Sequence, residues 1–318
     1  MDYFINNPFC ELLGIKYPVI QGGMAYIADA KLAAAVSNAG GLGIISGVSP
    51  SIEHLREQIR EAKRLTDKPF GINIMLMHES APEVAKLVIE EGVRVVSTGA
   101  GNPSVFLDEW NKADIKVLSV IPSVSYARLM ERSGVSAVIA EGQEAGGHIG
   151  ELTTMTLVPQ VVDAVKIPVA AAGGIADGRG IAAAFMLGAS AVQIGTRFLI
   201  ANECNIHQNY KDMVIKAGDI DTNVTGRRTG HPIRGLKSQF TRNFIAKESD
   251  PSITNEEIAK LGAGALKTAA VEGCKEKGYF MAGQSAGLIK KEQTVKEIID
   301  EMFSEFIGLM NGANKYVK

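Results

Sequence analysis

His148 is the titratable residue best placed for catalysis, because it lies between glycines in the segment from Glu141 to Gly150. This segment follows an apolar run that begins at Ala137, so the histidine is expected on a loop at the end of a strand. An imidazole gains or loses a proton near pH 7, which suits acid or base catalysis. The alternative is a loop histidine that only bonds to backbone. The other histidines are not spaced as metal ligands would be: His54, His78, His207 and His231.

Two glycine-rich loops predict a phosphate site. One contains Gly173 and Gly174, the other contains Gly195 and Thr196, and each directly follows an apolar run. Loops after the seventh and eighth strands of a parallel barrel commonly bind phosphate through backbone N–H groups and a helix N-terminus. A single glycine pair would indicate only a tight turn. Two such loops in the expected places favour a phosphorylated ligand.

A flat ring is expected beside this phosphate. The segment Gly22-Gly23-Met24 would let a ring lie against backbone, and Asn73 offers both a donor and an acceptor to a pyrimidine-like edge. Asn73 as a mere strand-end cap is the alternative. Glu141 is a candidate to bond a ribityl chain or to orient a neighbour, whereas Glu144 could as easily be solvated. A phosphate together with a ring edge indicates flavin mononucleotide (FMN). The sequence has no GxGxxG after a first strand and no Walker-type GKS/T, so it does not indicate another kind of nucleotide site.

The elements that must position these residues follow a repeating pattern. Eight short apolar runs start 21 to 32 residues apart, and a segment with helical spacing follows most of them. Strands that are apolar along their whole length are typical of parallel sheets buried on both faces. Eight such units without a crossover reversal predict a closed (β/α)8 TIM barrel of the α/β class. The runs begin near Val19, Gly43, Ile72, Val93, Lys116, Ala137, Val169 and Ala191.

Helix boundaries can be predicted for several of the intervening segments. Pro50 and Ser51 give a start signal for a helix whose apolar stripe extends from Ile52 to Leu65. Glycines that precede the next strand are expected to end helices in a left-handed conformation. These glycines are Gly40, Gly92, Gly134 and Gly188.

The pattern divides the chain into three parts. Residues 1–201 are expected to form the FMN-binding barrel. Residues 202–285, here called the cap, carry no further strand-like runs and are predicted to form an added, mainly helical subdomain that includes a helix near 255–261. Residues 286–318 are expected to form a helix that packs back onto the barrel through an apolar stripe from Val295 to Met310.

Composition excludes several classes of protein. With 33 Lys+Arg against 35 Asp+Glu in 318 residues, the net charge of −2 offers no overall field that would attract nucleic acid or anionic lipid. Three widely spaced cysteines argue against a disulfide framework or a zinc site and favour a reducing cytoplasm. No apolar run reaches the roughly 18 residues of a membrane span, and the N-terminal residues lack the pattern of a signal peptide.

Taken together, the motifs resemble the flavin-dependent enoyl-acyl carrier protein reductase II family of bacteria, within the wider nitronate monooxygenase-like superfamily. The likeness extends through nearly the whole chain, and the motif that ends near His148 is shared with nitronate monooxygenases. The segments that carry the resemblance are Ile20–Ala25, Lys68–Asn73, Thr98–Pro103, Glu141–Gly150, Ala171–Gly178, Gln193–Phe198 and Met281–Gln284.

The resemblance implies that FMN lies at the barrel mouth and that NADH or NADPH reduces it. The family then passes a hydride from flavin N5 to the β-carbon of a trans-2-enoyl thioester. His148 would polarise the thioester or supply the proton that the α-carbon needs, directly or through water. The expected cofactor-binding residues are Gly22, Gly23, Met24, Asn73, Glu141, Gly146, Gly173, Gly174, Gln193, Gly195, Thr196 and Met281.

The acyl carrier protein that the family uses is acidic, and a dense basic stretch in the cap could dock it. A solvated surface is the alternative, as for most basic stretches. The resemblance also implies a homodimer and allows a role for a monovalent cation, although no ligand set for a cation is readable. The candidate docking residues are Arg227, Arg228, Arg234, Lys237 and Arg242.

Two other functions compete with the enoyl reductase. A nitronate monooxygenase would use the same flavin and His148 to oxidise nitroalkane anions with oxygen, and it would ignore nicotinamide. A regulator that binds flavin or phosphate without turnover is a third alternative, which the exposed histidine among glycines disfavours. The preference for NADH or NADPH and the length of the acyl chain cannot be predicted.

Overall fold

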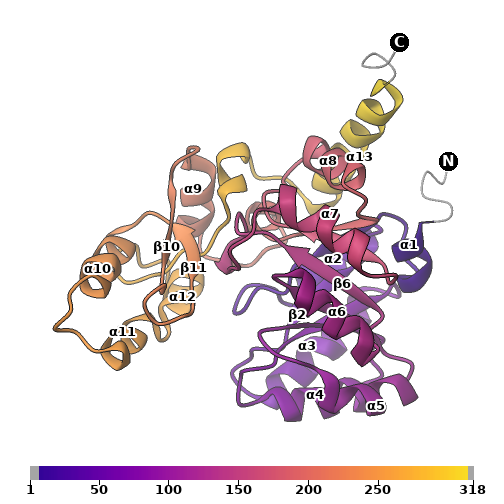
Figure 1. Ribbon diagram of the computed structural model, residues 1–318, viewed down its shortest axis with the longest axis horizontal. Coiled ribbons are helices and arrows are strands. Elements are labelled where there is room, and N and C mark those ends of the chain that lie inside the picture. Colours follow the sequence, from indigo (N-terminus) through magenta and orange to yellow (C-terminus); the bar gives the residue numbers. More distant parts are fainter. Residues whose placement is uncertain (1–6, 314–318) are drawn as a thin grey trace.

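Eight parallel strands form the centre of the larger part of the protein in the computed structural model, which describes residues 7–313 (Figure 1). Every expected apolar run contains or overlaps a strand, so the TIM barrel fold is confirmed. The sequence predictions for residues 1–6 and 314–318 lie outside the described residues. The barrel strands are β1 Val19–Gln21, β2 Gly43–Ser46, β3 Phe70–Met75, β4 Val95–Gly99, β5 Lys116–Ile121, β6 Ala137–Glu141, β8 Val169–Ala172 and β9 Ala191–Ile194.

The sheet closes between its first and last members. Its order is β1-β9-β8-β6-β5-β4-β3-β2, with all neighbours parallel. A parallel bridge then joins Ile20 of β1 to Leu42 beside β2, and the Gln21 amide donates to the Leu42 carbonyl over 2.9 Å. This bridge completes the ring of strands, so their carboxyl ends meet around one mouth.

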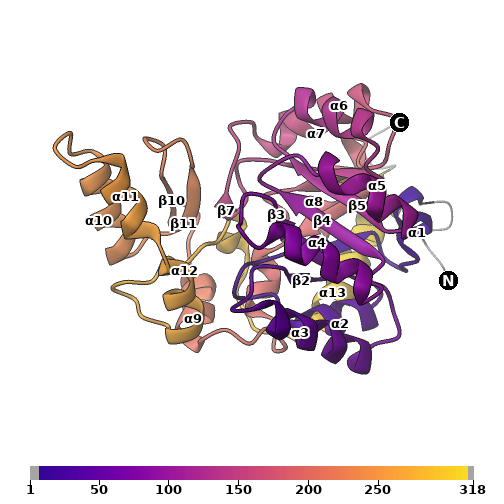
Figure 2. The same ribbon diagram turned by 90° about the horizontal axis from the view of Figure 1, so that it is seen from below.

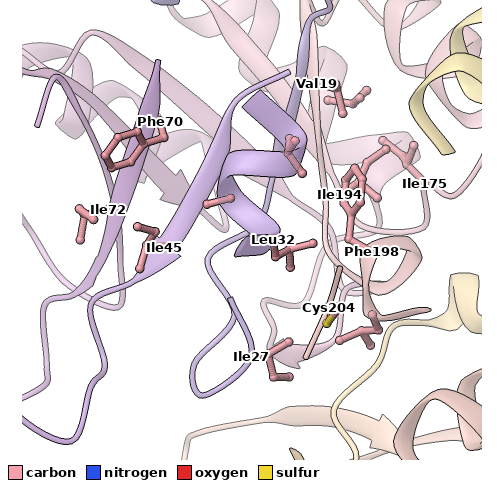
Figure 3. Close-up of a cluster of buried hydrophobic side chains, with 14 of the residues drawn as sticks. Val19, Ile27, Leu32, Ile45, Phe70, Ile72, Ile175, Ile194, Phe198 and Cys204 are labelled. Atoms are coloured by element: carbon pink, nitrogen blue, oxygen red, sulfur yellow. The ribbon is translucent and has the colours of Figure 1, made fainter. Parts of the chain in front are cut away.

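The strands are apolar throughout because alternate side chains serve two different cores. In β2, Ile44 lies inside the barrel, whereas Ile45 packs toward the surrounding helices. Figure 3 shows part of this outer layer, with Ile45 and Ile72 on adjacent strands and Leu32 on the covering helix. Phe9 belongs to the inner cluster, so the first helix joins the core of the barrel interior.

Helices cover the outside of the barrel (Figures 1 and 2). The predicted helix 52–65 is confirmed, and its Ser51 side chain accepts a hydrogen bond from the His54 amide over 3.1 Å. Gly40, Gly92, Gly134 and Gly188 all have positive φ, as expected. The helices are α1 Pro8–Leu13, α2 Ala30–Asn38, α3 Ile52–Leu65, α4 Ala81–Glu90, α5 Ser104–Lys112, α6 Val124–Ser133, α7 Thr154–Ala164 and α8 Gly178–Met186.

The cap is inserted before the last helix of the barrel. The chain leaves β9 through the short helix η1 (Thr196–Ile200), and Ala201 then bridges to Gln293, which lies just before the returning helix α13 (Val295–Asn311). The Asn202 amide also donates to the Gln293 carbonyl over 2.9 Å. Helix α13 packs against α8 and α2, so it completes the outer ring of helices (Figure 1).

The cap is mainly helical, but the expectation that it carries no strands is wrong. The hairpin of β10 (Thr222–Thr225) and β11 (Ile233–Leu236) forms an antiparallel sheet with β7 (Gly147–His148), a strand of the barrel side. The sequences TNVT and IRGL are too polar and too short to resemble the apolar barrel strands. The other cap elements are α9 Gln208–Lys216, α10 Gln239–Glu248, α11 Asn255–Gly262, α12 Ala265–Lys267, the π-helix η2 Thr268–Glu272 and the 3₁₀ helix η3 Gln284–Leu288, which extends past residue 285.

Within residues 7–313, none of the helices is long and apolar enough to cross a membrane. The three cysteines are free thiols, and burial raises the pKa of both Cys10 and Cys204 to about 12. Both thiols are therefore uncharged and unreactive at neutral pH.

Candidate functional site

The mouth of the barrel brings together most of the loops that the sequence singled out. Strands β1 and β9 pair with Gln21 opposite Ile194, which places Gly22 beside Gly195. On the other side of the same loop, Gly23 lies against Asn73 at the end of β3. Segments far apart in the sequence thus form one rim, as expected for the carboxyl ends of parallel strands.

The two glycines of the first loop differ in whether neighbouring protein atoms require a glycine there. A Cβ on Gly23 would lie 2.1 Å from Cβ of Asn73, so only glycine lets these two loops meet. A Cβ on Gly22 would instead find its nearest protein atom at 3.7 Å, and the same is true at Gly195, where the neighbour is Met24. No neighbour among residues 7–313 therefore requires glycine at these two positions, although Gly22 is buried and its N–H donates to the Ile194 carbonyl.

Two side-chain amides at this rim keep donors available. The Ser97 hydroxyl donates to Oδ1 of Asn73 over 3.0 Å, which fixes the amide and leaves its Nδ2 group free to donate. The side-chain amide of Gln193, which is 8% exposed, has no hydrogen-bond partner among residues 7–313. These groups can recognise the polar edge of a ring.

The expected phosphate loops present free backbone donors. Among residues 7–313, the N–H groups of Gly173, Gly174, Gly195 and Thr196 donate to no protein acceptor. Gly173 and Gly174 have φ of 95° and 76°, which side chains other than glycine rarely adopt. Successive N–H groups in such a turn make a concave anion site.

The contribution expected from a helix N-terminus is wrong for α8. The Asp177 carboxylate accepts from the amides of Arg179 and Gly180, and the Glu305 carboxylate accepts from the Gly178 amide over 2.8 Å. These carboxylates already satisfy the first N–H groups of the helix. An anion at this rim must therefore rely on the glycine loops.

His148 is held by the cap rather than by the barrel alone. It lies on β7 directly opposite Ile233 of β11, and the next amide, of Ile149, donates to the Pro232 carbonyl over 3.0 Å. Its side chain still reaches solvent. The surrounding protein, together with His231, lowers the pKa of His148 below its ordinary value. The imidazole is therefore mostly neutral at pH 7.

Arg234 is not a surface residue, which corrects its assignment to a docking surface. It is 6% exposed and lies on β11 opposite Gly147. Its Nε donates to the Gln143 carbonyl over 2.9 Å and its Nη1 donates to Oγ1 of Thr222 over 3.1 Å. This arginine fastens the loop of residues 142–150, here called the His148 loop, to the cap. The burial lowers the pKa of Arg234, although the guanidinium keeps its charge.

Arg228 is exposed but already bound within the cap. Its guanidinium donates to the carbonyls of Glu248, Asp250 and Ile253, which lie between α10 and α11. Its charge is thus partly used to hold this connection. Arg227, Lys237 and Arg242 are exposed, as a surface role requires.

The end of the cap packs closely against the His148 loop. A Cβ on Gly146 would lie 2.7 Å from backbone atoms of both Ala282 and Gly283, so glycine is needed there for this contact. The Gly283 amide donates to Oγ1 of Thr196 over 2.9 Å. Met281 lies in the same segment, and its carbonyl accepts from the Tyr210 hydroxyl over 2.6 Å. Gly146 and Thr196 therefore join the cap to the mouth, whereas the Met281 hydrogen bond lies within the cap.

The two glutamates after β6 differ sharply. Burial raises the pKa of Glu141, at the end of the strand, to about 7. Glu144 is not simply solvated, because its carboxylate accepts from the amide and the hydroxyl of Thr154 at the start of α7, over 3.0 and 2.9 Å. Sequence reasoning had no signal for this contact, since an acidic residue in a glycine-rich loop looks equally suited to solvent.

Comparison with known proteins is consistent with this site. The family model for nitronate monooxygenase matches residues 6–305. The chain belongs to the nitronate monooxygenase family. The solved structure of FabK from Thermotoga maritima is 47% identical to this chain, with a TM-score of 0.96 over 98% of this chain and 100% of that one.

Two curated relatives carry other names. One from Rhodococcus jostii is named (3aS,4S,5R,7aS)-5-hydroxy-7a-methyl-1-oxo-octahydro-1H-indene-4-carboxyl-CoA dehydrogenase; it is 34% identical over 95% of this chain and 96% of its own. A probable nitronate monooxygenase from Staphylococcus saprophyticus is 34% identical over 94% of this chain and 97% of its own.

These likenesses establish the protein as an oxidoreductase with a flavin cofactor. The residues at the mouth fit such a group. Among residues 7–313, no atom of a non-adjacent residue would lie closer than 3.7 Å to a Cβ on Gly22 or Gly195, the amides of Asn73 and Gln193 have donors without an acceptor, and the N–H groups of Gly173 and Gly174 are unpaired. In residues 7–313, no three His, Cys, Asp or Glu side chains gather as a metal site.

Proposed function

We propose that this protein is an FMN-dependent enoyl-acyl carrier protein reductase that uses NADH or NADPH to reduce the double bond of a trans-2-enoyl thioester in fatty-acid elongation. The observation that carries this proposal is the likeness to FabK, an enoyl-acyl carrier protein reductase II, over 98% of this chain and therefore through the cap. A relative named as a carboxyl-CoA dehydrogenase adds a second thioester substrate within the same group of relatives.

The rim residues would hold the cofactor in a simple division of tasks. Gly22, Gly23 and Met24 would lie beside the ring, with the amides of Asn73 and Gln193 on its polar edge. The N–H groups of Gly173, Gly174, Gly195 and Thr196 would bind the phosphate. Glu141 would hold or share a proton beside the cofactor, because its pKa of about 7 keeps both protonation states populated at neutral pH.

Bound FMN would accept two electrons from the nicotinamide and deliver a hydride to the β-carbon of the enoyl group. His148 would act on the thioester end of the substrate. Because the lowered pKa keeps the imidazole neutral, its N–H suits hydrogen bonding to the thioester carbonyl better than direct donation of its proton. The proton for the α-carbon would then arrive through water or from another acid.

A nitronate monooxygenase is the second candidate, because the family model and the staphylococcal relative carry that name. A neutral histidine at the mouth would also suit the task of a base that binds or deprotonates a nitroalkane. The two functions differ in the reductant and in the fate of the electrons. The reductase needs nicotinamide and an enoyl thioester, whereas the monooxygenase needs only a nitronate and oxygen.

Anaerobic spectroscopy of the purified protein tests this proposal. We expect NADH or NADPH to bleach the flavin absorbance, and a subsequent addition of crotonyl thioester to restore it rapidly. A flavin that nicotinamide fails to bleach but a nitronate reduces would support the monooxygenase instead. A protein that takes up no FMN would overturn both functions.

A further inference from the structure

The outer side of the cap carries an open groove alongside helix α10. It has a volume of about 450 Å³. Its apolar lining comes from Phe240 and Phe244 of α10 and from Leu261 of α11, and Phe244 is largely buried. A second, smaller hollow continues from it and shares Glu276. Together the two form one depression, here called the basic groove.

Cations surround this groove. Lys247, Lys260 and Lys277 line the larger hollow, and Lys237, Arg242 and Lys275 line the smaller one. All six are exposed, and none forms an ion pair with another residue of the described range 7–313. Glu276 is the single acidic residue among those that line either hollow. The groove therefore presents a strongly positive rim around an apolar floor.

The groove is connected to the catalytic histidine through one buried side chain. The ring of Phe240 lies 5.3 Å from the ring of Tyr279. The Tyr279 hydroxyl donates to the carbonyl of Ile233 over 2.7 Å, and Ile233 is the strand partner of His148. A protein seated on α10 would thus lie one layer of side chains behind the strand that holds His148.

We propose that the basic groove is the docking surface for the acidic acyl carrier protein that delivers the enoyl thioester. This inference rests on the proposed function for the identity of the partner. The cations come from three separate segments of the chain, residues 237–247, Lys260 and residues 275–277. Helix α10, which overlaps the first segment, has ten residues and extends over about 15 Å. Such a spread matches the acidic face of a protein helix, with the apolar floor for its hydrophobic residues. The phosphates of coenzyme A would need a more compact cluster of donors.

The test compares two double charge reversals that change the net charge equally. Lys247→Glu with Lys260→Glu alters the groove, while Lys86→Glu with Lys112→Glu alters exposed lysines on the barrel helices α4 and α5. Enoyl reduction is measured with carrier-bound and with coenzyme A-bound substrate. For the groove variant we expect kcat/KM to fall about 10- to 100-fold with the carrier-bound substrate and to stay within about twofold with the coenzyme A-bound one. The barrel variant should resemble the wild type with both.

Equal losses on both substrates in the groove variant would overturn the proposal in favour of a coenzyme A phosphate site. No loss on either would overturn it as well. Calorimetric titration with acyl carrier protein tests the surface independently of turnover, and we expect the groove variant alone to bind it more weakly. If the wild type reduced no enoyl substrate, the proposed function would fail, and this titration would still decide whether the groove binds the carrier.

Discussion

The barrel and the cap organise their strands by different physical means. Each barrel strand has neighbours on both sides and is buried on both faces, so its position depends on two hydrophobic cores. The cap sheet has three short strands, and one of them is the two-residue β7 from the barrel side. The proposed FMN-binding rim therefore lies on the barrel, whereas His148 lies at the junction of the two parts. Cofactor binding and catalysis should respond to different mutations.

Substitution of His148 should give the largest effect, a loss of catalysis without a loss of the cofactor. We expect His148→Ala to retain bound FMN and to lose about 100- to 1000-fold in enoyl reduction, since the group that binds the thioester is removed. Absorbance of the flavin and steady-state rates measure the two properties. His231→Ala, on the exposed turn of the cap hairpin, is the control and should stay within a few-fold of the wild type. Full turnover in His148→Ala would refute the assignment.

Loss of Arg234 should show that the cap positions the histidine. Arg234→Ala removes the hydrogen bond to the Gln143 carbonyl, which fastens the His148 loop, together with the bond to Thr222 inside the cap. We therefore expect kcat to fall about 10- to 100-fold while FMN affinity changes little. The pH profile of kcat should shift as well, because the surroundings of His148 change. Arg234→Lys should recover part of the rate.

Arg228→Ala is the matched control, because Arg228 binds carbonyls of the cap that do not contact the His148 loop. It should lower thermal stability with little effect on kcat for a coenzyme A-bound substrate. Equal losses of kcat in the two arginine variants would mean that kcat depends on the overall stability of the cap and not on the contact of Arg234 with the His148 loop.

Glu141, at the end of β6, allows the barrel to be tested through the pH dependence of its stability. Burial raises the pKa of Glu141 from its ordinary value of 4.5 to about 7, so this carboxyl destabilises the folded protein only when it is ionised. Its unfavourable contribution to stability is absent below pH 4.5, grows as the pH rises and is complete above pH 7. A full shift of this size is worth about 3 kcal/mol; since the side chain keeps some contact with water, we expect about 2 kcal/mol. Urea unfolding of Glu141→Gln should show this gain over wild type at pH 8 and almost none at pH 4.5. If Glu141→Gln differed from the wild type in stability by the same amount at both pH values, the raised pKa of a buried carboxyl would be contradicted.

The two glycines of the first loop give the smallest and most specific test. Gly22→Ala adds a methyl group whose nearest protein atom would lie 3.7 Å away, so we expect FMN affinity to fall about tenfold without a change in the unfolding temperature of the apoprotein. Gly23→Ala forces a clash with Asn73 and should destabilise the apoprotein itself. If Gly22→Ala bound FMN as tightly as the wild type, the proposed position of the cofactor beside Gly22 would be wrong.

The barrel could be predicted from the sequence because its signals are local. The run that begins at Lys116 and the left-handed glycine at position 134 each bound an element within a few residues of its own sequence. The rim residues followed, since strand ends in a barrel are brought together by the topology. Asn73 and Gly195 therefore lie where the pattern placed them.

The cap could not be predicted in this way, because its contacts are distant in sequence. Nothing near Arg234 indicates that its strand pairs with Gly147, so a dense basic stretch looked like a surface. The same limit applies to Gly146, whose neighbours are Ala282 and Gly283 at the far end of the cap. Glu144 likewise finds its partner on Thr154 through the fold of a loop.

The adjacent positions of Ala201 and Gln293 have a consequence for how such enzymes diversify. Because the whole cap leaves and rejoins the barrel at one bridge, its length and content can change without moving α13 from its place beside α8. Evolution can therefore replace the cap while the barrel, with its proposed FMN site, stays the same. Any replacement must still supply a strand edge for residues 147 and 148 and close neighbours for Gly146 and Thr196, and these requirements couple the evolution of the two parts.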